Sequence, residues 1–298
     1  MDANPAVPRA RCIVGLAALG VIWGTTWVAT DTLSEYMPPL RGEAMRFLLA
    51  ALVSTPVILI RRVPLPRGRA LGFVLLLSAT MLCLPSLLLL WSRQHASSVT
   101  VTVLFAAMPL LVAALASAPS AAMQAAMVGL GAVALALSAS FSLSQAAGAA
   151  VALVAVTSTG ASALLVRREL RNASPLAVTS TLLGAAGMLL FLASLVLERG
   201  HPIAWNPAAI AAIGFLALVA GVPAYVLYIW LLQNMEAYKV VTVQWIQILV
   251  ALAEAAFFLR AGWSISMIAG SVVTLTCLLV VMRVRLDDDN TVSLIPNS

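Results

Sequence analysis

Residues 175–197 read PLAVTSTLLGAAGMLLFLASLVL, and this run contains no charged side chain. As an α-helix it is long enough to cross a hydrocarbon core about 30 Å thick. Similar apolar runs, separated by charged residues, proline and glycine, fill most of the chain and predict ten membrane-spanning helices. The ten spans are expected near residues 13–31, 39–60, 70–92, 97–117, 122–140, 147–166, 175–197, 207–232, 239–259 and 264–283.

The composition excludes a water-soluble protein. Of the 298 residues, 62% are hydrophobic and 9% are charged, whereas soluble domains contain about 45 to 50% apolar and about 25% charged residues. So much apolar surface can be buried only in lipid, which rules out a soluble enzyme, a nucleic-acid-binding protein and a disordered chain. Because the apolar runs are continuous rather than alternating, they favour helices over a β-barrel. The sequence therefore predicts an all-α integral membrane protein.

The basic residues indicate how the helices are oriented. Twelve of the 17 lysines and arginines lie before the first predicted span or after an even-numbered one. These twelve are Arg9, Arg11, Arg61, Arg62, Arg67, Arg69, Arg167, Arg168, Arg171, Lys239, Arg283 and Arg285. Since short, positively charged loops stay in the cytoplasm, both chain termini are expected to be cytoplasmic. This placement requires an even number of spans.

Five predicted spans precede residue 146 and five follow it, which suggests a duplicated unit. The expected domains are residues 1–146 and 147–286, followed by a short polar cytoplasmic tail at 287–298. Because each unit has an odd number of spans, the second unit would enter the membrane upside down. Two inverted five-helix repeats of this kind are typical of secondary transporters.

Several short motifs resemble the EamA-type branch of the drug/metabolite transporter superfamily. They are Trp23-Gly24-Thr25 in span 1, Arg46 after the Pro38-Pro39 turn, Gln94-His95-Ala96-Ser97-Ser98 between spans 3 and 4, Pro109 in span 4 and Gly129 in span 5. Members of the family commonly have Gly-Glu at the ends of spans 4 and 9, where this chain has Pro119-Ser120 and Arg260-Ala261. The resemblance covers nearly the whole chain and implies a diverged, EamA-like member.

The repeat and the resemblance together imply a secondary transporter that works by alternating access between its two halves. The solute is expected to be a small organic metabolite such as an amino acid, which is exported or exchanged. No G-x-x-x-x-G-K-[ST] phosphate loop occurs, so the energy is expected to come from a gradient rather than from bound ATP. No cofactor and no oligomeric state is indicated. The alanine-rich composition favours the bacterial cytoplasmic (inner) membrane.

A polar stripe in span 9 is the first candidate for the solute path. Gln244, Gln247 and Glu254 fall within about an 80-degree arc of an α-helix. A carboxyl group within a membrane is costly and therefore marks a functional candidate. The stripe would line a cavity that accepts an amine or a proton, which would allow proton coupling. The alternative is that the glutamines form hydrogen bonds between helices.

Glu43 and Arg46 lie three residues apart in span 2, so their charges can pair on one helix face. This pair would form an outer gate or contact a solute carboxylate, with a structural pair or an interfacial arginine as the alternative. Pro109 in span 4, like Pro85 and Pro223 in spans 3 and 8, is expected to kink its helix. The kinks would act either as rocking points or as fixed bends.

Aromatic and hydroxyl side chains complete the predicted site. Trp23 and Thr26 lie in span 1, and Tyr225 and Tyr228 lie in span 8. Together they would line a pocket for a zwitterionic or partly apolar solute, with lipid-facing packing as the alternative. Trp27 is expected in the interfacial belt instead.

Two other functions remain open on the sequence. A phosphorylated sugar or a nucleotide sugar would need cationic contacts, for which Lys239 and Arg46 are the candidates. A polytopic membrane enzyme or a lipid-handling protein would need a nucleophile, a base or a metal cluster near one membrane face. The sequence indicates none of these, because its two histidines, His95 and His201, are isolated from each other and from the carboxylates.

Overall fold

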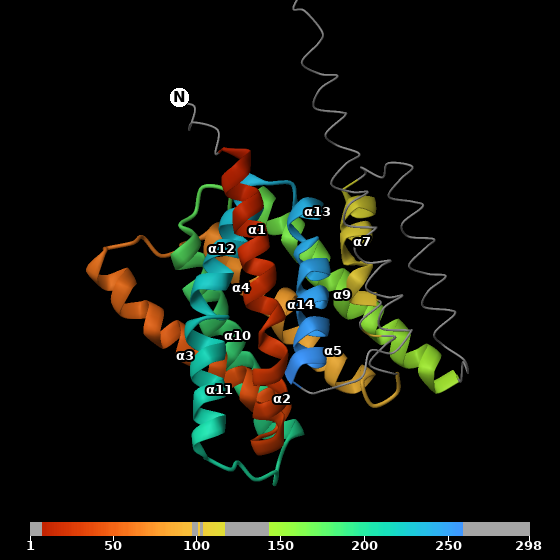
Figure 1. The fold of residues 1–298 in the computed structure, drawn as a ribbon. Coiled ribbons are helices and arrows are strands. Elements are labelled where there is room, and N and C mark those ends of the chain that lie inside the picture. Colours follow the sequence, from red (N-terminus) through yellow and green to blue (C-terminus); the bar gives the residue numbers. More distant parts are fainter. Residues whose placement is uncertain (1–7, 97–100, 102–103, 117–142, 259–298) are drawn as a thin grey trace, which may run out of the picture.

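The computed structural model describes residues 8–96, 101, 104–116 and 143–258 (Figure 1). All regular secondary structure within these ranges is helical. Six of the helices there are long and apolar enough to cross a membrane. They comprise Ala10–Tyr36, Pro39–Ile60, Arg69–Ser92, Leu143–Glu169, Pro175–Leu197 and Pro207–Asn234. The chain is therefore a multi-pass helical membrane protein.

These six helices coincide with predicted spans 1, 2, 3, 6, 7 and 8. The central parts of spans 4 and 9 are also helical, as α7 (Met108–Leu115) and α14 (Val243–Phe258), with the short α13 (Ala237–Val240) preceding α14. Predicted spans 5 and 10, at 122–140 and 264–283, lie outside the described residues.

Three of the long helices are interrupted within the span. Span 1 consists of α1 (Arg9–Gly24) and α2 (Thr26–Tyr36). Span 3 consists of α4 (Arg69–Leu77), the π-helical turn η1 (Ser78–Cys83) and α5 (Leu84–Ser92). Span 8 consists of α11 (Pro207–Leu218) and α12 (Val222–Asn234). The interruptions in spans 3 and 8 stand directly before Pro85 and Pro223, as expected for residues that lack an N–H group and crowd the preceding turn.

Helix starts follow the local sequence. Ser174 and Asn206 each precede a proline and accept a hydrogen bond from the backbone three residues on, which fixes the first turns of α10 (Pro175–Leu197) and α11. Helix α3 (Pro39–Ile60) is capped from a distance: the carboxylate of Glu198 accepts hydrogen bonds from the amides of Leu40 at 2.8 Å and Arg41 at 3.0 Å. The end of α10 therefore holds the start of α3.

Helices α3 and α10 pack closely along their lengths. A side chain added at Gly187 would lie 2.9 Å from Leu48 Cγ, so glycine permits the approach. The hydroxyl of Ser54 donates to that of Ser180 at 2.9 Å. Small residues and interhelical hydrogen bonds of this kind hold helices together in lipid, where apolar burial provides little net driving force.

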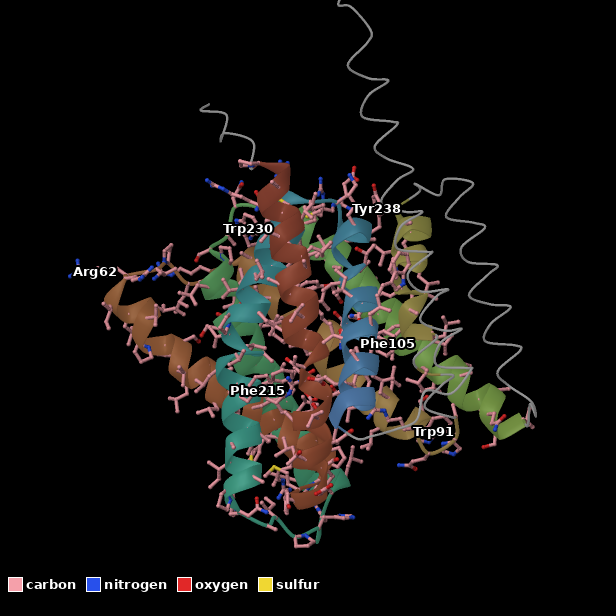
Figure 2. All side chains as sticks on the ribbon, viewed as in Figure 1. Arg62, Trp91, Phe105, Phe215, Trp230 and Tyr238 are labelled. Carbon is pink, nitrogen blue, oxygen red and sulfur yellow. The ribbon has the colours of Figure 1, made fainter. Side chains whose placement is uncertain are left out.

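The loops gather at two ends of the bundle. At one, which we call the basic end, Arg69 after α3 pairs with Glu169 of α9 (Leu143–Glu169) at 3.0 Å. At the opposite end, the amide of Ala204 donates to the carbonyl of Tyr36 at 2.8 Å. Trp230 and Tyr238 lie toward the basic end in Figure 2, and Trp91 lies near the opposite end. Loops that the sequence assigns to one side of the membrane thus meet at one end of the fold.

Candidate functional site

A cavity of about 520 Å³ lies between the helices, with walls from both halves of the chain. Segments α1, α2, α3, η1 and α5 contribute from before residue 146, and α9, α12 and α14 contribute from after it. Eight of the ten residues predicted from the sequence line this cavity: Trp23, Thr26, Glu43, Arg46, Tyr225, Tyr228, Gln244 and Gln247. The structure therefore brings together side chains from near the two ends of the described chain.

An aromatic cluster forms one part of the wall. The Trp23 ring lies 5.3 Å from the Tyr225 ring and 5.1 Å from the Tyr228 ring, measured between centroids. Phe47 meets Tyr225 edge to face at 6.1 Å. Such edge-to-face arrangements suit aromatic quadrupoles and fix the rings in place. The cluster presents a rigid, partly apolar surface to the cavity.

The predicted Glu43–Arg46 pair is confirmed on α3. Arg46 donates through Nε to one carboxylate oxygen of Glu43 at 3.1 Å and through Nη2 to both oxygens at 2.8 and 3.0 Å. The guanidinium also lies 4.4 Å above the Phe47 ring. Pairing and stacking together reduce the cost of keeping both charges within the membrane.

Several polar groups on the wall have no partner among the described residues. The hydroxyls of Tyr225 and Tyr228, the side-chain amides of Gln244 and Gln247, and Nη1 of Arg46 make no hydrogen bond to this part of the chain. None of them belongs to the fully enclosed polar atoms that lack a partner, so all reach the cavity. Polar groups held within a bundle need hydrogen bonds, and here water or a solute can supply them.

The cavity continues toward the opposite end. A smaller cavity of about 220 Å³, lined by Met37, Pro38 and Pro39, shares Asp31 and Arg93 with the large one. Toward the basic end, the buried side chains of Trp245, Tyr238, Val240 and Val241 fill the space between the helices. The cavity therefore extends toward the opposite end, and buried side chains close it toward the basic end.

Sequence reasoning missed several wall residues. Asp31 and Arg93 line the cavity, although the sequence places both at the ends of spans. Trp27, which the sequence favoured as a lipid-facing or interfacial residue, also lines it. Phe47, Phe105 and Thr159 are further members of this group. For Thr159, the cluster of hydroxyls at 157–159 in an apolar span was a signal that could have been used.

Glu254 and Pro109 do not line the cavity. Glu254 belongs to α14, but the cavity wall on that helix ends at Ile248. The Oε2 atom of Glu254 is enclosed and has no hydrogen-bond partner among the described residues. Pro109 is buried within α7. The described ranges also contain no group of three or more side chains suited to bind a metal ion.

The fold and this cavity define a helical membrane protein with an internal space lined by both polar and apolar side chains. The chain belongs to the EamA-like transporter family, which matches it twice, over residues 10–143 and 146–283. The family domain is therefore duplicated, and we refer to the two matches as the first and second copies.

Curated relatives are named as transporters or carry no functional description. The chain is 33% identical over 96 residues to an uncharacterized transporter in the trpA 3′ region of Buchnera aphidicola subsp. Schlechtendalia chinensis. It is 30% identical over 96 residues to the protein PagO of Salmonella typhimurium. Each match covers 32% of this chain and 31% of the relative, so the similarity spans about a third of either protein.

One solved crystal structure has the same fold. It superposes with a TM-score of 0.75 over 93% of this chain and 99% of its own, at 16% sequence identity. The family and the names of the relatives indicate a membrane transporter rather than an enzyme.

Proposed function

We propose that this protein is a secondary transporter that moves a small zwitterionic metabolite, such as an amino acid, out of the cell by alternating access. The observation that carries this proposal is the cavity between the two copies, whose wall combines an aromatic cluster with unpaired polar groups. A cavity of about 520 Å³ falls in the range of small-molecule binding sites. Binding between two halves is what a rocking mechanism requires.

The proposed topology has ten spans, with both termini in the cytoplasm of a bacterial cell and the protein in its inner membrane. Two observations support an inverted repeat. Helices α1 and α2 run toward the opposite end, where Tyr36 meets Ala204, whereas α9 runs toward the basic end, where Glu169 meets Arg69. The first spans of the two copies therefore run in opposite directions (Figure 1).

The charges on the wall favour a zwitterion over an anion. Two carboxylates, Asp31 and Glu43, and two guanidinium groups, Arg46 and Arg93, line the cavity, so its charged side chains balance. Nη1 of Arg46 remains available to a solute carboxylate, which arginine binds well. Lys239, the other cation suggested for a phosphorylated sugar, does not line the cavity and pairs with Glu236 at 3.1 Å. A phosphorylated substrate therefore gains no support.

In this proposal the structure represents the outward-facing state. If the basic end faces the cytoplasm, the cavity continues toward the outside, and the buried side chains around Trp245 close the cytoplasmic path. Export then requires this packing to open while the outer part closes.

Flux into proteoliposomes tests the proposed function. A panel of radiolabelled amino acids and related zwitterions is expected to give saturable uptake with at least one solute. Replacing Trp23 with alanine should raise the KM of that solute, because the ring forms the centre of the aromatic cluster. Thr55→Val serves as the control, since Thr55 is exposed and its hydroxyl bonds only to Ala51 of its own helix. Absence of saturable flux across the panel would refute the proposal.

Glu254 is proposed to carry a coupled proton. Its enclosed oxygen without a partner among the described residues supports this role, because an unpaired carboxylate within a bilayer is held more cheaply in its protonated form. A Glu254→Gln variant should transport with a rate that no longer responds to an imposed pH gradient. If the response to the gradient persists in this variant, proton coupling at Glu254 is wrong, while the transport function still stands.

A further inference from the structure

The π-helical turn η1 leaves one carbonyl without its usual donor. The amide of Leu84 donates to the carbonyl of Ala79, five residues back, rather than to Thr80. In the same register, the carbonyl of Thr80 would accept from residue 85, which is a proline and has no N–H. Such a carbonyl within a membrane requires another donor.

A side chain from the second copy fills this position. The hydroxyl of Ser158 on α9 donates to the carbonyl of Thr80 at 2.6 Å. One turn further on, the hydroxyl of Ser162 lies 2.8 Å from that of Thr80. Thr159, between these two serines, lines the cavity, as do Met81 and Leu82 of η1. The contact therefore ties the irregular turn of span 3 to the other half of the protein, directly beside the cavity.

Span 8 shows the same arrangement with the halves exchanged. Helix α11 ends at Leu218, and α12 starts at Val222, just before Pro223. The carbonyl of Ala220, in this interruption, accepts a hydrogen bond from the indole Nε1 of Trp23 at 3.3 Å. Here the donor comes from the first copy and the broken span belongs to the second.

The two contacts occupy corresponding places in the duplicated domain. The first family match starts at residue 10 and the second at residue 146. Counted from these two starts, Pro85 and Pro223 fall at nearly the same position of the domain. Trp23 and Ser158 likewise fall at nearly the same position as each other. Both the breaks and the donors are thus related by the repeat.

A third contact follows the same rule in span 4. The chain turns at Ala107 before Pro109, and the indole Nε1 of Trp245 donates to the carbonyl of Ala106 at 2.6 Å. Trp245 is fully buried and belongs to the second copy. The breaks before Pro85, Pro109 and Pro223 are therefore each closed by a side chain from the opposite copy.

We propose that Ser158, Trp23 and Trp245 are positioning residues that form crossed latches: each holds a proline break in the other copy, so that a break can rearrange only when the two copies move relative to each other. This inference rests on the proposed function, because it assigns the latches to the transport cycle. Trp23 both lines the cavity and closes the span 8 latch, so a solute that contacts its ring acts directly on that latch.

Hydrogen–deuterium exchange of the full chain in nanodiscs tests the latches without any solute. Ser158→Ala should speed exchange of the amides in 79–84 about five- to tenfold, the effect of losing one hydrogen bond worth about 1 kcal/mol, and leave 219–225 unchanged. Trp23→Phe keeps an aromatic ring but removes the N–H group. It should speed exchange of the amides in 219–225 and leave those in 79–84 unchanged. Trp245→Phe should affect the segment around Ala106 alone.

Matched variants separate a latch from general destabilisation. Ser158→Thr retains the hydroxyl and should restore slow exchange in 79–84. Thr157→Ala alters the preceding residue of α9, which makes no hydrogen bond to the described residues, and should have no effect. Alkylation of Cys83, buried at the end of η1, gives a second readout in a chain whose other two cysteines are serines. Its rate should rise with Ser158→Ala only.

Unchanged exchange in all three variants, or equal acceleration in every segment, would overturn the crossed latches. The flux assay is a separate outcome. If exchange follows the crossed pattern but no solute is transported, the proposed function is wrong and the latches stand as structural contacts. If flux is saturable, Ser158→Ala should lower the maximal rate more than it changes KM, because Ser158 does not line the cavity.

Discussion

Arg46 holds both carboxylate oxygens of Glu43, at 2.8 to 3.1 Å, on the wall of the cavity. The two side chains are only 16% and 27% exposed, so each depends on the other for much of its charge compensation. This mutual dependence makes their separate and joint replacement informative.

Arg46→Gln should destabilise the protein more than the double variant Arg46→Gln with Glu43→Gln. The single change leaves a partly buried carboxylate without its partner, which costs up to about 3 kcal/mol, whereas the double change removes both charges. Thermal unfolding in detergent measures the difference. Under the proposed function, the double variant should regain stability but not flux. Recovery of both would show that the pair is purely structural.

Gly24→Ala should separate α1 from α14. A β-carbon at Gly24 would lie 2.4 Å from Cβ of Val250, so the helices must move apart, at a cost of about 1 to 3 kcal/mol. Gly72→Ala in α4 is the control, because nothing lies within 4 Å of the added methyl group, and it should be neutral or slightly stabilising. Val250→Ala should partly rescue Gly24→Ala. Equal melting temperatures for both alanine variants would contradict the close packing.

Gln233 and Gln244 should respond differently to replacement by leucine. Gln233 donates to the carbonyls of Leu170 at 2.7 Å and Ala173 at 2.9 Å, so Gln233→Leu should lower the free energy of unfolding by about 1 to 3 kcal/mol. Gln244 has no partner among the described residues and faces the cavity, so Gln244→Leu should leave stability unchanged. Solute flux through the Gln244→Leu variant should fall nevertheless. A large loss of stability in Gln244→Leu would indicate packing rather than a solute contact.

Labelling with a membrane-impermeant maleimide in intact cells tests the proposed orientation. A single cysteine at Arg67, in the exposed loop after α3, should be protected until the membrane is opened. A cysteine at Arg199, exposed at the opposite end, should react at once. The reverse pattern would place the basic end outside and invert the assignment of the open side of the cavity.

The boundaries of spans 2 and 7 could be predicted to the residue, because each starts at a proline and ends at a charged side chain. The predicted span 1 is too short, because Asp31 suggests an end at residue 31. The helix continues to Tyr36, since a helix can carry polar residues beyond the hydrocarbon core without ending.

Polar wall residues could be predicted because polar groups are rare and costly in a membrane. Phe47 and Phe105 could not, since nothing in a chain that is 62% hydrophobic separates a cavity-lining phenylalanine from a lipid-facing one. The prediction of a polar stripe was only partly correct. The prediction considered only the angle of each residue around the helix axis and ignored its position along that axis. The helix rises about 10 Å between Gln247 and Glu254, which takes Glu254 past the end of the cavity wall.

The distribution of indole rings has a practical consequence. Of the seven tryptophans, Trp23 and Trp27 face the cavity, while Trp245 is fully buried in the packed region near the basic end. These tryptophans are therefore intrinsic fluorophores in different environments, facing the cavity or enclosed by side chains. Entry of an unlabelled solute can be followed by emission and by quenching with iodide, which gives a way to screen ligands before any radiolabelled compound is chosen.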